Sequence, residues 1–270
     1  MIDSRENYRS HIQKAHWGTH ALRTPESTAA FFLPYVRQGM RLLDVGCGTG
    51  SITQGFVRYV AEGGGSVVGV DVNSEAIDFA NSRFSGEGIS FVEANLYHLP
   101  FFENSADAIF CHGVLIHMRD PVSALREMYR ILSPGGIVGL SAVDHDSMII
   151  YPKNIWLEKS IRLYERLWRL GSGWGEDSKE GSDLYLGKKL RELSVKSGFK
   201  TAIASARAVY EGDSLSTKRA AEQEIEHLKA EQLKQYVIDY KVATEAEIEK
   251  MIDSWHMWGE DESVSGKTCL

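Results

Sequence analysis

Short apolar runs of strand length alternate with amphipathic stretches of helix length through the first half of the chain. Strands are predicted by the runs at 41–45, 66–72, 89–94, 106–114 and 137–143. Start signals and helical spacing predict helices that begin near Thr24, Ser51, Ser74 and Asp120, the last of which closes at Gly135. This alternation predicts an α/β fold, in which a parallel sheet is covered by helices on both faces.

From about residue 151 onward the pattern becomes mainly helical. Two helices, a candidate strand and two more helices are predicted there, beginning with 154–171, 186–200 and 201–210. The last helix starts at Thr244, where Glu247 completes a capping box. It carries an apolar stripe, for which we expect core packing rather than a binding surface: Ile248, Met251, Ile252, Trp255 and Trp258.

The composition is that of an ordinary globular protein. The 270 residues are 43% apolar and carry a net charge of -7, whereas a nucleic-acid-binding face needs clustered Lys and Arg. No run of about eighteen apolar residues occurs, so no membrane segment is expected. Cys47, Cys111 and Cys269 are too far apart to indicate a disulfide framework or a zinc site. We therefore expect a cytoplasmic protein that binds no metal, nucleic acid or membrane.

The sequence LLDVGCGTGSIT, residues 42–53, places three glycines where a strand turns into a helix. Gly46, Gly48 and Gly50 leave bare backbone there, and backbone N–H groups at such a turn bind anions. A dinucleotide-binding turn has its third glycine one position later, where this chain has Ser51. The spacing therefore disfavours NAD.

Asp44 and Asp71 extend the turn to a D-x-G-x-G-x-G…D pattern, in which the second Asp ends the following strand. This pattern resembles that of the class I S-adenosylmethionine-dependent methyltransferases. Two further stretches resemble other parts of this family, FVEANLYHLPF and ADAIFCHGVLIHM. A third, ALREMYRILSPGGIVGLS, resembles the ubiquinone/menaquinone-type, small-molecule branch. The resemblance covers Met40 to Ala142 closely, and it implies a doubly wound, mostly parallel seven-stranded sheet with a helical lid.

The resemblance also implies contacts with a methyl donor, S-adenosyl-L-methionine, whose product is S-adenosyl-L-homocysteine. The glycine turn, including Cys47, lets backbone approach the methionine end of the donor, and Asp44 helps to fix that end. Asp71, with Val72 beside it, accepts hydrogen bonds from both ribose hydroxyls. A carboxylate suits a vicinal diol because charge-assisted hydrogen bonds are the stronger kind.

Further donor contacts are implied at the ends of the third and fourth strands. Asn95, with Leu96, lies where the family places adenine, although Asn departs from the usual Asp. The alternative for Asn95 is a turn residue that bonds its own backbone. The backbone around Cys111 and His112 would meet the amino group and sulfonium of the donor, while a packed core histidine is the alternative for the His112 side chain.

An N-terminal lid is implied in the same way. In related enzymes the segment that corresponds to residues 1–23 folds over the donor. By that resemblance Arg23 pairs with the methionine carboxylate and Tyr8 closes the site. Surface charge and local packing are the alternative explanation for both residues.

Acceptor and proton-transfer residues are predicted after the fourth and fifth strands. His145 and Asp144 follow the fifth strand at the carboxyl edge, where open α/β sheets bind ligands, so either is a candidate base. Solvated loop residues are the alternative. His117, Trp168 and Trp174 are candidates for acceptor contact, because a sulfonium favours aromatic, water-poor surroundings. Core packing is the alternative for the tryptophans.

We expect one domain over residues 1–270. Its parts would be a lid at 1–23, a cofactor-binding core at 24–150, a helical acceptor-pocket insertion at 151–190 and a C-terminal part at 191–270. The expected function is methyl transfer to a small molecule, such as a secondary metabolite, with the methylated atom left open. A non-catalytic sensor or scaffold that binds the donor is the main alternative, and an NAD-dependent oxidoreductase is disfavoured.

Overall fold

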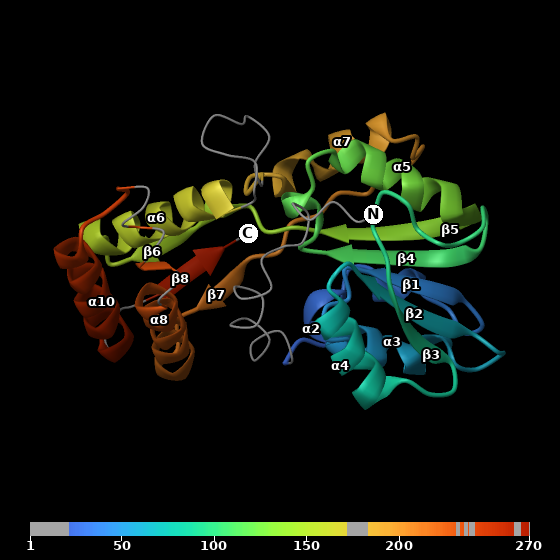
Figure 1. Ribbon diagram of the computed structural model, residues 1–270, viewed down its shortest axis with the longest axis horizontal. Helices are drawn as coiled ribbons and strands as arrows, with labels where there is room; N and C mark the ends of the chain where they lie inside the picture. Colours follow the sequence, from blue (N-terminus) through green and yellow to red (C-terminus); the bar gives the residue numbers. More distant parts are fainter. Residues whose placement is uncertain are drawn as a thin grey trace. The chain divides into compact units, whose positions relative to one another are not determined.

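The computed structural model describes residues 22–171, 183–230, 233–234, 237, 241–261 and 266–269. Contacts within the chain define two compact units (Figure 1), which are unit 1 (Met1–Ala142 and Leu186–Ile203) and unit 2 (Val143–Tyr185 and Ala204–Leu270). Each unit is thus built from two separate stretches of sequence. The expected boundaries near 150 and 190 differ from these, and the organisation into one functional domain stays a prediction.

Unit 1 contains a parallel sheet, as the alternating pattern predicted. Its strands are β1 (Arg41–Val45), β2 (Ser66–Asp71), β3 (Ile89–Glu93), β4 (Ala106–His112) and β5 (Leu132–Ser141). Their order is β3-β2-β1-β4-β5, and every neighbouring pair is parallel. The α/β class and the doubly wound order are confirmed. The described residues form five strands of this sheet, so the count of seven is not confirmed.

The helices of unit 1 begin where the sequence signals them. They are α2 (Pro25–Thr28), α3 (Ser51–Val60), α4 (Ser74–Phe84), α5 (Pro121–Ile131) and α7 (Leu190–Lys196), with short 3-10 turns η1 (Leu33–Tyr35), η2 (Leu115–His117) and η4 (Gly187–Lys189). Thr24 caps α2, whose first residue is Pro25. The helix predicted to begin near Thr24 is thus a single turn.

The end of α5 was predicted wrongly at Gly135. The helix stops at Ile131, and Leu132 is already extended at φ -71° and ψ 130°. Leu132 pairs with Ala106, so strand pairing takes over before the Ser-Pro-Gly-Gly sequence is reached. Ser133 precedes a proline, which disfavours helical backbone there.

Both faces of the central strands of unit 1 are buried. On one face Leu42, Val67, Ala108 and Phe110 pack with Phe56 and Val60 of α3 and with Phe32. The alternate residues of the same strands, Leu43 and Ile109, are no more than 3% exposed. This continuous burial is typical of a parallel sheet between two helical layers.

Unit 2 is built around a small antiparallel sheet that the sequence did not predict. Its strands are β6 (Ile149–Tyr151), β7 (Val209–Glu211) and β8 (Gly266–Cys269), in the order β6-β8-β7. Its helices are α6 (Ile155–Gly171), α8 (Ser214–Lys229) and α10 (Glu245–Glu260), and a 3-10 turn, η3, spans His145–Ser147. The candidate strand at 201–210 is reduced to β7, which begins at Val209.

The core of unit 2 contains the whole apolar stripe of α10. All five stripe residues are buried, and they pack with residues of α6 and α8. Trp255 is 0% exposed, and its indole Nε1 donates to Ser160 Oγ at 2.8 Å. Thr244 and Glu247 form the predicted capping box. The stripe is therefore core, as expected.

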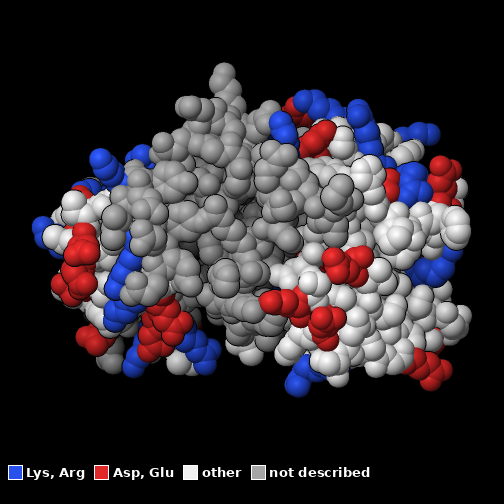
Figure 2. Space-filling model, viewed as in Figure 1, with Lys and Arg blue, Asp and Glu red and all other residues white. Residues whose placement is uncertain are grey.

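The described surface mixes both signs of charge. On the face drawn in Figure 2, Lys and Arg side chains alternate with Asp and Glu side chains rather than forming one continuous basic stripe. Among the helices of the described ranges, none is both long enough and apolar enough to cross a bilayer.

Candidate functional site

The strand order of unit 1 reverses between β1 and β4, which defines where a ligand is expected. The connection that leaves β1 leads to β2 on one side, and the one that leaves β4 leads to β5 on the other. Ligands of open α/β sheets bind at the carboxyl ends of strands at such a point. The two connections touch here, because a Cβ on Gly46 would lie 2.1 Å from Cγ2 of Val114.

The glycine turn after β1 needs glycine for two different reasons. Gly46, Gly48 and Gly50 all have positive φ angles, of 75°, 54° and 83°, which other residues adopt only with strain. A Cβ on Gly50 would also lie 2.7 Å from the ring of Phe91. A Cβ on Gly48 would meet no atom within 4 Å. Gly48 thus presents bare backbone to open space, while its neighbours serve the packing of the turn.

Asp71 holds the glycine turn to the end of β2. Its Oδ2 accepts a hydrogen bond from the Gly48 N–H at 2.9 Å, and its Oδ1 accepts one from the Asn73 N–H at 2.9 Å. Burial raises the pKa of this carboxyl, although the backbone hydrogen bonds lower it. Each carboxylate oxygen can accept more than one hydrogen bond. Asp71 is therefore fixed in place and keeps capacity for further donors.

Asn73 was not among the predicted site residues. Its side chain caps α4 by accepting from the Ala76 N–H at 3.1 Å, while its own N–H orients Asp71. The sequence contained the signal, because an Asn directly before a helix of the Ser-Glu-Ala type is a typical N-cap.

Asp44 lies beneath the turn and is only 3% exposed. Thr53 Oγ1 of α3 donates to Asp44 Oδ2 at 2.6 Å. The pKa of Asp44 is raised to about 7, mainly by burial and also by the charge of Asp71, although the hydrogen bond from Thr53 lowers it. Thr53 is a second residue that the sequence reasoning missed. The expected contact between Asp44 and the amino-acid end of a donor stays a prediction.

Two cysteines whose side chains the structure describes, Cys47 and Cys111, are free thiols in unit 1. Cys111 in β4 is 1% exposed, and burial raises the pKa of its thiol. Burial also raises the pKa of Cys47 well above its usual value, and the charges of Asp71 and Asp44 add to this. Neither thiol is activated as a nucleophile, because a raised pKa disfavours the reactive thiolate.

Arg23 and His112 lie beside the same edge. His112 ends β4, is paired with Ser141 of β5, and stacks on Phe110 with centroids 6.3 Å apart and planes at 11°. Burial and the charge of Arg23 lower the pKa of His112 to about 4. Burial alone lowers the pKa of Arg23.

Comparisons with known proteins place this arrangement in a family. A model described as a methyltransferase domain matches residues 43–140. The chain is 33% identical over 177 residues to the ubiquinone/menaquinone biosynthesis C-methyltransferase UbiE of Escherichia coli, covering 63% of this chain and 67% of that relative. The chain belongs to the class I S-adenosylmethionine-dependent methyltransferases.

Other relatives agree with this assignment. An uncharacterised methyltransferase of Schizosaccharomyces pombe is 37% identical over 179 residues, which are 60% of this chain and 64% of that relative. The chain thus spans less than two thirds of the length of this relative. A solved structure from Bacillus halodurans shares the fold with a TM-score of 0.52 at 16% identity, covering 89% of this chain and 95% of that chain.

In this methyltransferase, the residues after β3 form a turn. Asn95 Oδ1 accepts from the Tyr97 N–H at 2.9 Å, which is the backbone contact named above as the alternative role of Asn95. Leu96 is 8% exposed and belongs to the core. Val72 lies next to Asp71, and its backbone N–H helps to lower the pKa of the Asp71 carboxyl. Adenine contacts by Asn95 and Leu96 stay predictions.

The predicted base, His145, belongs to unit 2 of the methyltransferase. Asp144 caps η3 by accepting from the Asp146 N–H at 3.2 Å. Burial and the charge of Lys267 lower the pKa of His145, while the charges of Glu224 and Asp144 raise it. Lys267 Nζ and Glu224 Oε1 form an ion pair at 3.1 Å. His145 is therefore neutral and lies in a charged setting, while its role as a base stays a prediction.

The remaining predicted residues are placed only in part. His117 ends η2 in unit 1. Trp168 lies in α6, but its side chain falls outside the described residues, as do Tyr8 and Trp174 altogether. Their predicted contacts with acceptor or donor stay predictions.

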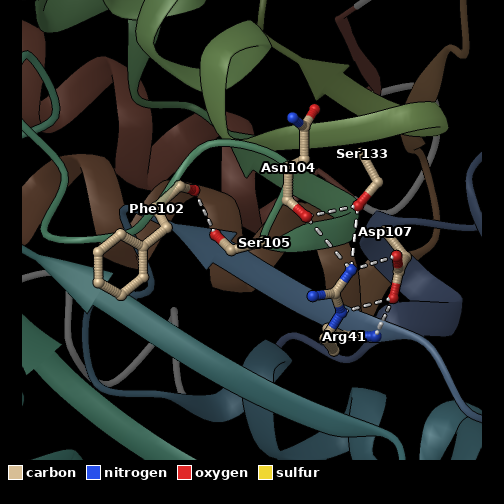
Figure 3. Close-up of polar contacts among 6 residues, drawn as sticks. All are labelled: Arg41, Phe102, Asn104, Ser105, Asp107 and Ser133. Atoms are coloured by element: carbon tan, nitrogen blue, oxygen red, sulfur yellow. Dashed lines mark hydrogen bonds and ion pairs between the residues drawn. The ribbon is translucent and has the colours of Figure 1, made fainter.

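A small cavity of about 110 Å³ lies at the opposite, amino edge of the sheet. Figure 3 shows the polar rim beside it, where the guanidinium of Arg41 donates to both oxygens of Asp107, at 3.0 and 2.8 Å. The ring of Phe102 points away from this rim and is 88% exposed. The cavity is lined mainly by β1, β2 and β4 at the ends remote from the glycine turn, so it is separate from the switch-point site.

Proposed function

We propose that this methyltransferase binds S-adenosyl-L-methionine at the glycine turn and transfers its methyl group to a small-molecule acceptor. The main observation in support is that Gly48 presents open backbone directly beside the fixed carboxylate of Asp71. Both lie at the point where the strand order reverses. The donor supplies a methyl carbon on a positively charged sulfur, which is a good leaving group. The protein's task is to align donor and acceptor, and alignment accounts for much of the rate.

The residues that would hold the donor fit its chemistry. The Asp71 oxygens retain acceptor capacity for the two ribose hydroxyls. The open turn at Gly48 admits the chain that leads to the methionine end, where Arg23 would pair with the carboxylate. Cys47 and Asp44 would shape the floor of this site rather than react.

The acceptor decides whether a base is needed. In the transfer, the nucleophilic atom forms a bond to the methyl carbon while the carbon–sulfur bond breaks and its electron pair stays on sulfur. A thiol acceptor ionises easily, whereas a hydroxyl or an acidic carbon must pass a proton to a base. For those acceptors we propose His145, assisted by Asp144, since a neutral imidazole can take up a proton.

We also propose the finer features expected from the sequence. Residues 1–23 would act as a lid, and the region 151–190 would bind the acceptor through Trp168 or Trp174. His117, which follows the fourth strand, would also contact the acceptor, and secondary metabolites are included among the acceptors. The protein would work in the cytoplasm, without metal, nucleic acid or membrane. The 33% sequence identity to a ubiquinone/menaquinone biosynthesis C-methyltransferase supports the proposal of a small-molecule acceptor.

Calorimetry with S-adenosyl-L-homocysteine and with NAD tests the proposal first. We expect S-adenosyl-L-homocysteine to bind and NAD not to bind. Labelled donor is then incubated with a library of small thiols, phenols, amines and acidic carbon compounds. Binding of the product without transfer to any acceptor would favour the non-catalytic sensor, and binding of NAD in place of the product would refute the assignment.

A further inference from the structure

Two nitrogen-containing side chains beside the switch point have no partner among the residues that the structure describes. His112 Nδ1 is buried without a hydrogen bond. Arg23 is half-buried, and no described carboxylate or carbonyl accepts from its guanidinium. Leaving a buried polar nitrogen without a hydrogen-bond partner is unfavourable, and more so for a charged group. A cluster that carries this cost at a predicted ligand edge indicates that a ligand supplies what is missing.

The ring of His112 is packed in place, and the backbone next to Arg23 is anchored at a helix start. The ring of His112 lies parallel to Phe110, which itself packs against Phe32 at 5.6 Å and Phe56 at 5.2 Å. Arg23 directly precedes Thr24, the cap of α2. The chain that carries Arg23 therefore leads into the same layer that buries one face of β4, and the charge of Arg23 is close enough to lower the pKa of His112.

The chemistry of the pair selects an anion. Arg23 is a permanent cation with several donors, and a neutral imidazole always carries one N–H. Both can therefore donate to one acceptor group, whereas two donors of this kind repel a cation. A carboxylate matches a guanidinium particularly well, because its two oxygens accept two parallel hydrogen bonds.

We propose that His112 acts with Arg23 as a carboxylate-binding pair, which holds the α-carboxylate at the amino-acid end of the methyl donor. This inference rests on the proposed function and adds a side-chain role for His112. The imidazole donates one hydrogen bond to the carboxylate that Arg23 neutralises. Through this contact His112 fixes the amino-acid end and thereby the direction of the neighbouring sulfonium.

The test compares two ligands that differ in the amino-acid end. S-adenosyl-L-homocysteine carries the carboxylate, while 5′-methylthioadenosine keeps the adenosine and the sulfur but lacks it. His112→Phe retains the aromatic stack on Phe110 and removes the N–H, and His112→Asn restores a donor in a smaller side chain. His256→Phe is the matched control, because His256 is exposed on α10 in unit 2.

We expect His112→Phe to weaken S-adenosyl-L-homocysteine about tenfold in calorimetry, as for loss of one hydrogen bond to a charged group. Affinity for 5′-methylthioadenosine should not change, His112→Asn should recover most of the loss, and His256→Phe should bind like wild type. In Arg23→Gln combined with His112→Phe, the loss should be smaller than the product of the two single losses, because both contacts serve one carboxylate.

Three results would overturn the inference while leaving the proposed function intact. They are unchanged affinity of His112→Phe for S-adenosyl-L-homocysteine, equal weakening of both ligands, and independent effects of Arg23→Gln and His112→Phe. Failure of the wild-type protein to bind either ligand would instead refute the proposed function. Melting temperatures of all variants exclude misfolding as the cause.

Discussion

The two units of this methyltransferase each bury a sheet, but they differ in where their polar groups lie. In unit 1 the central strands are buried on both faces, and the polar groups of the candidate site lie at the carboxyl edge, around Asp71 and the glycine turn. In unit 2 an ion pair between Lys267 and Glu224 lies within the unit, with side chains 14% and 22% exposed.

The difference has a physical origin in strand length and connectivity. Parallel strands of five or more residues need helices on both sides and leave only their ends free for ligands. The strands of unit 2 have three or four residues, so the sheet depends on side-chain contacts with α8 and α10. The polar groups at the carboxyl edge of unit 1 are therefore available for a ligand, while the ion pair of Lys267 and Glu224 joins β8 to α8 within unit 2.

The core of unit 2 offers the largest expected effect. Trp255→Ala should lower the free energy of unfolding by about 3–5 kcal/mol, as for removal of a fully buried aromatic ring. Trp255→Phe keeps most of the packing and loses the bond to Ser160, so it should cost about 1 kcal/mol. Hydrogen exchange should rise first in the peptides of α8 and α10. An equal rise throughout unit 1 would contradict the comparison.

Substitution of Asp71 tests whether the carboxyl edge of the unit 1 sheet binds the donor. Asp71→Ala should weaken S-adenosyl-L-homocysteine by about 2–4 kcal/mol in calorimetry, since it removes two charge-assisted bonds to the ribose and the anchor of Gly48. Asp78→Ala, which changes an exposed carboxylate on α4, is the matched control and should bind like wild type. Unchanged affinity of Asp71→Ala would refute the assignment of this edge.

Asp44 makes the stability of unit 1 depend on pH in an unusual direction. Its pKa is about 7 in the folded protein, above the value of about 3.9 in an unfolded chain, so the folded state binds the proton more tightly. Stability should therefore fall as pH rises from about 4 through 7, by about 2–3 kcal/mol between pH 5 and pH 8.

Asp44→Asn should remove this contribution while keeping an acceptor for Thr53. Denaturant unfolding at pH 5 and pH 8 measures the difference between the variant and the wild type. The same slope in both proteins would mean that Asp44 ionises normally despite its burial.

Asn95 gives the smallest expected effect and separates its two roles. If Asn95 contacts adenine, Asn95→Asp should keep most of the affinity for S-adenosyl-L-homocysteine, and Asn95→Leu should lose about 1–3 kcal/mol. If its role is the turn contact to Tyr97, Asn95→Leu should instead lower the melting temperature and leave the affinity of the folded protein unchanged. Calorimetry and thermal unfolding of both variants distinguish the two outcomes.

Local chemistry explains why the strands of unit 1 and helix starts in both units could be predicted from the sequence. The caps at Thr24 and Thr244, the start of α3 after Gly50 and the period of the apolar residues depend on contacts a few positions apart. The spacing of Gly46, Gly48 and Gly50 with Asp71 was enough to indicate the family. The structure then showed the close contacts that require glycine at two of these positions, Gly46 beside Val114 and Gly50 beside Phe91.

Only the tertiary structure decided the features that join distant parts of the chain. Residues 266–269 form the central strand between β6 and β7, which lie far away in sequence. Pairing of such distant short strands leaves no local pattern of apolar residues from which the sheet could be predicted. The bond from Thr53 to Asp44 and the neighbourhood of Arg23 and His112 arise in the same way. The sequence determined the glycine turn, its acidic partners and most helix starts because these follow from short-range backbone rules. The division into units and the setting of each buried charge depend on long-range packing, which no single segment encodes.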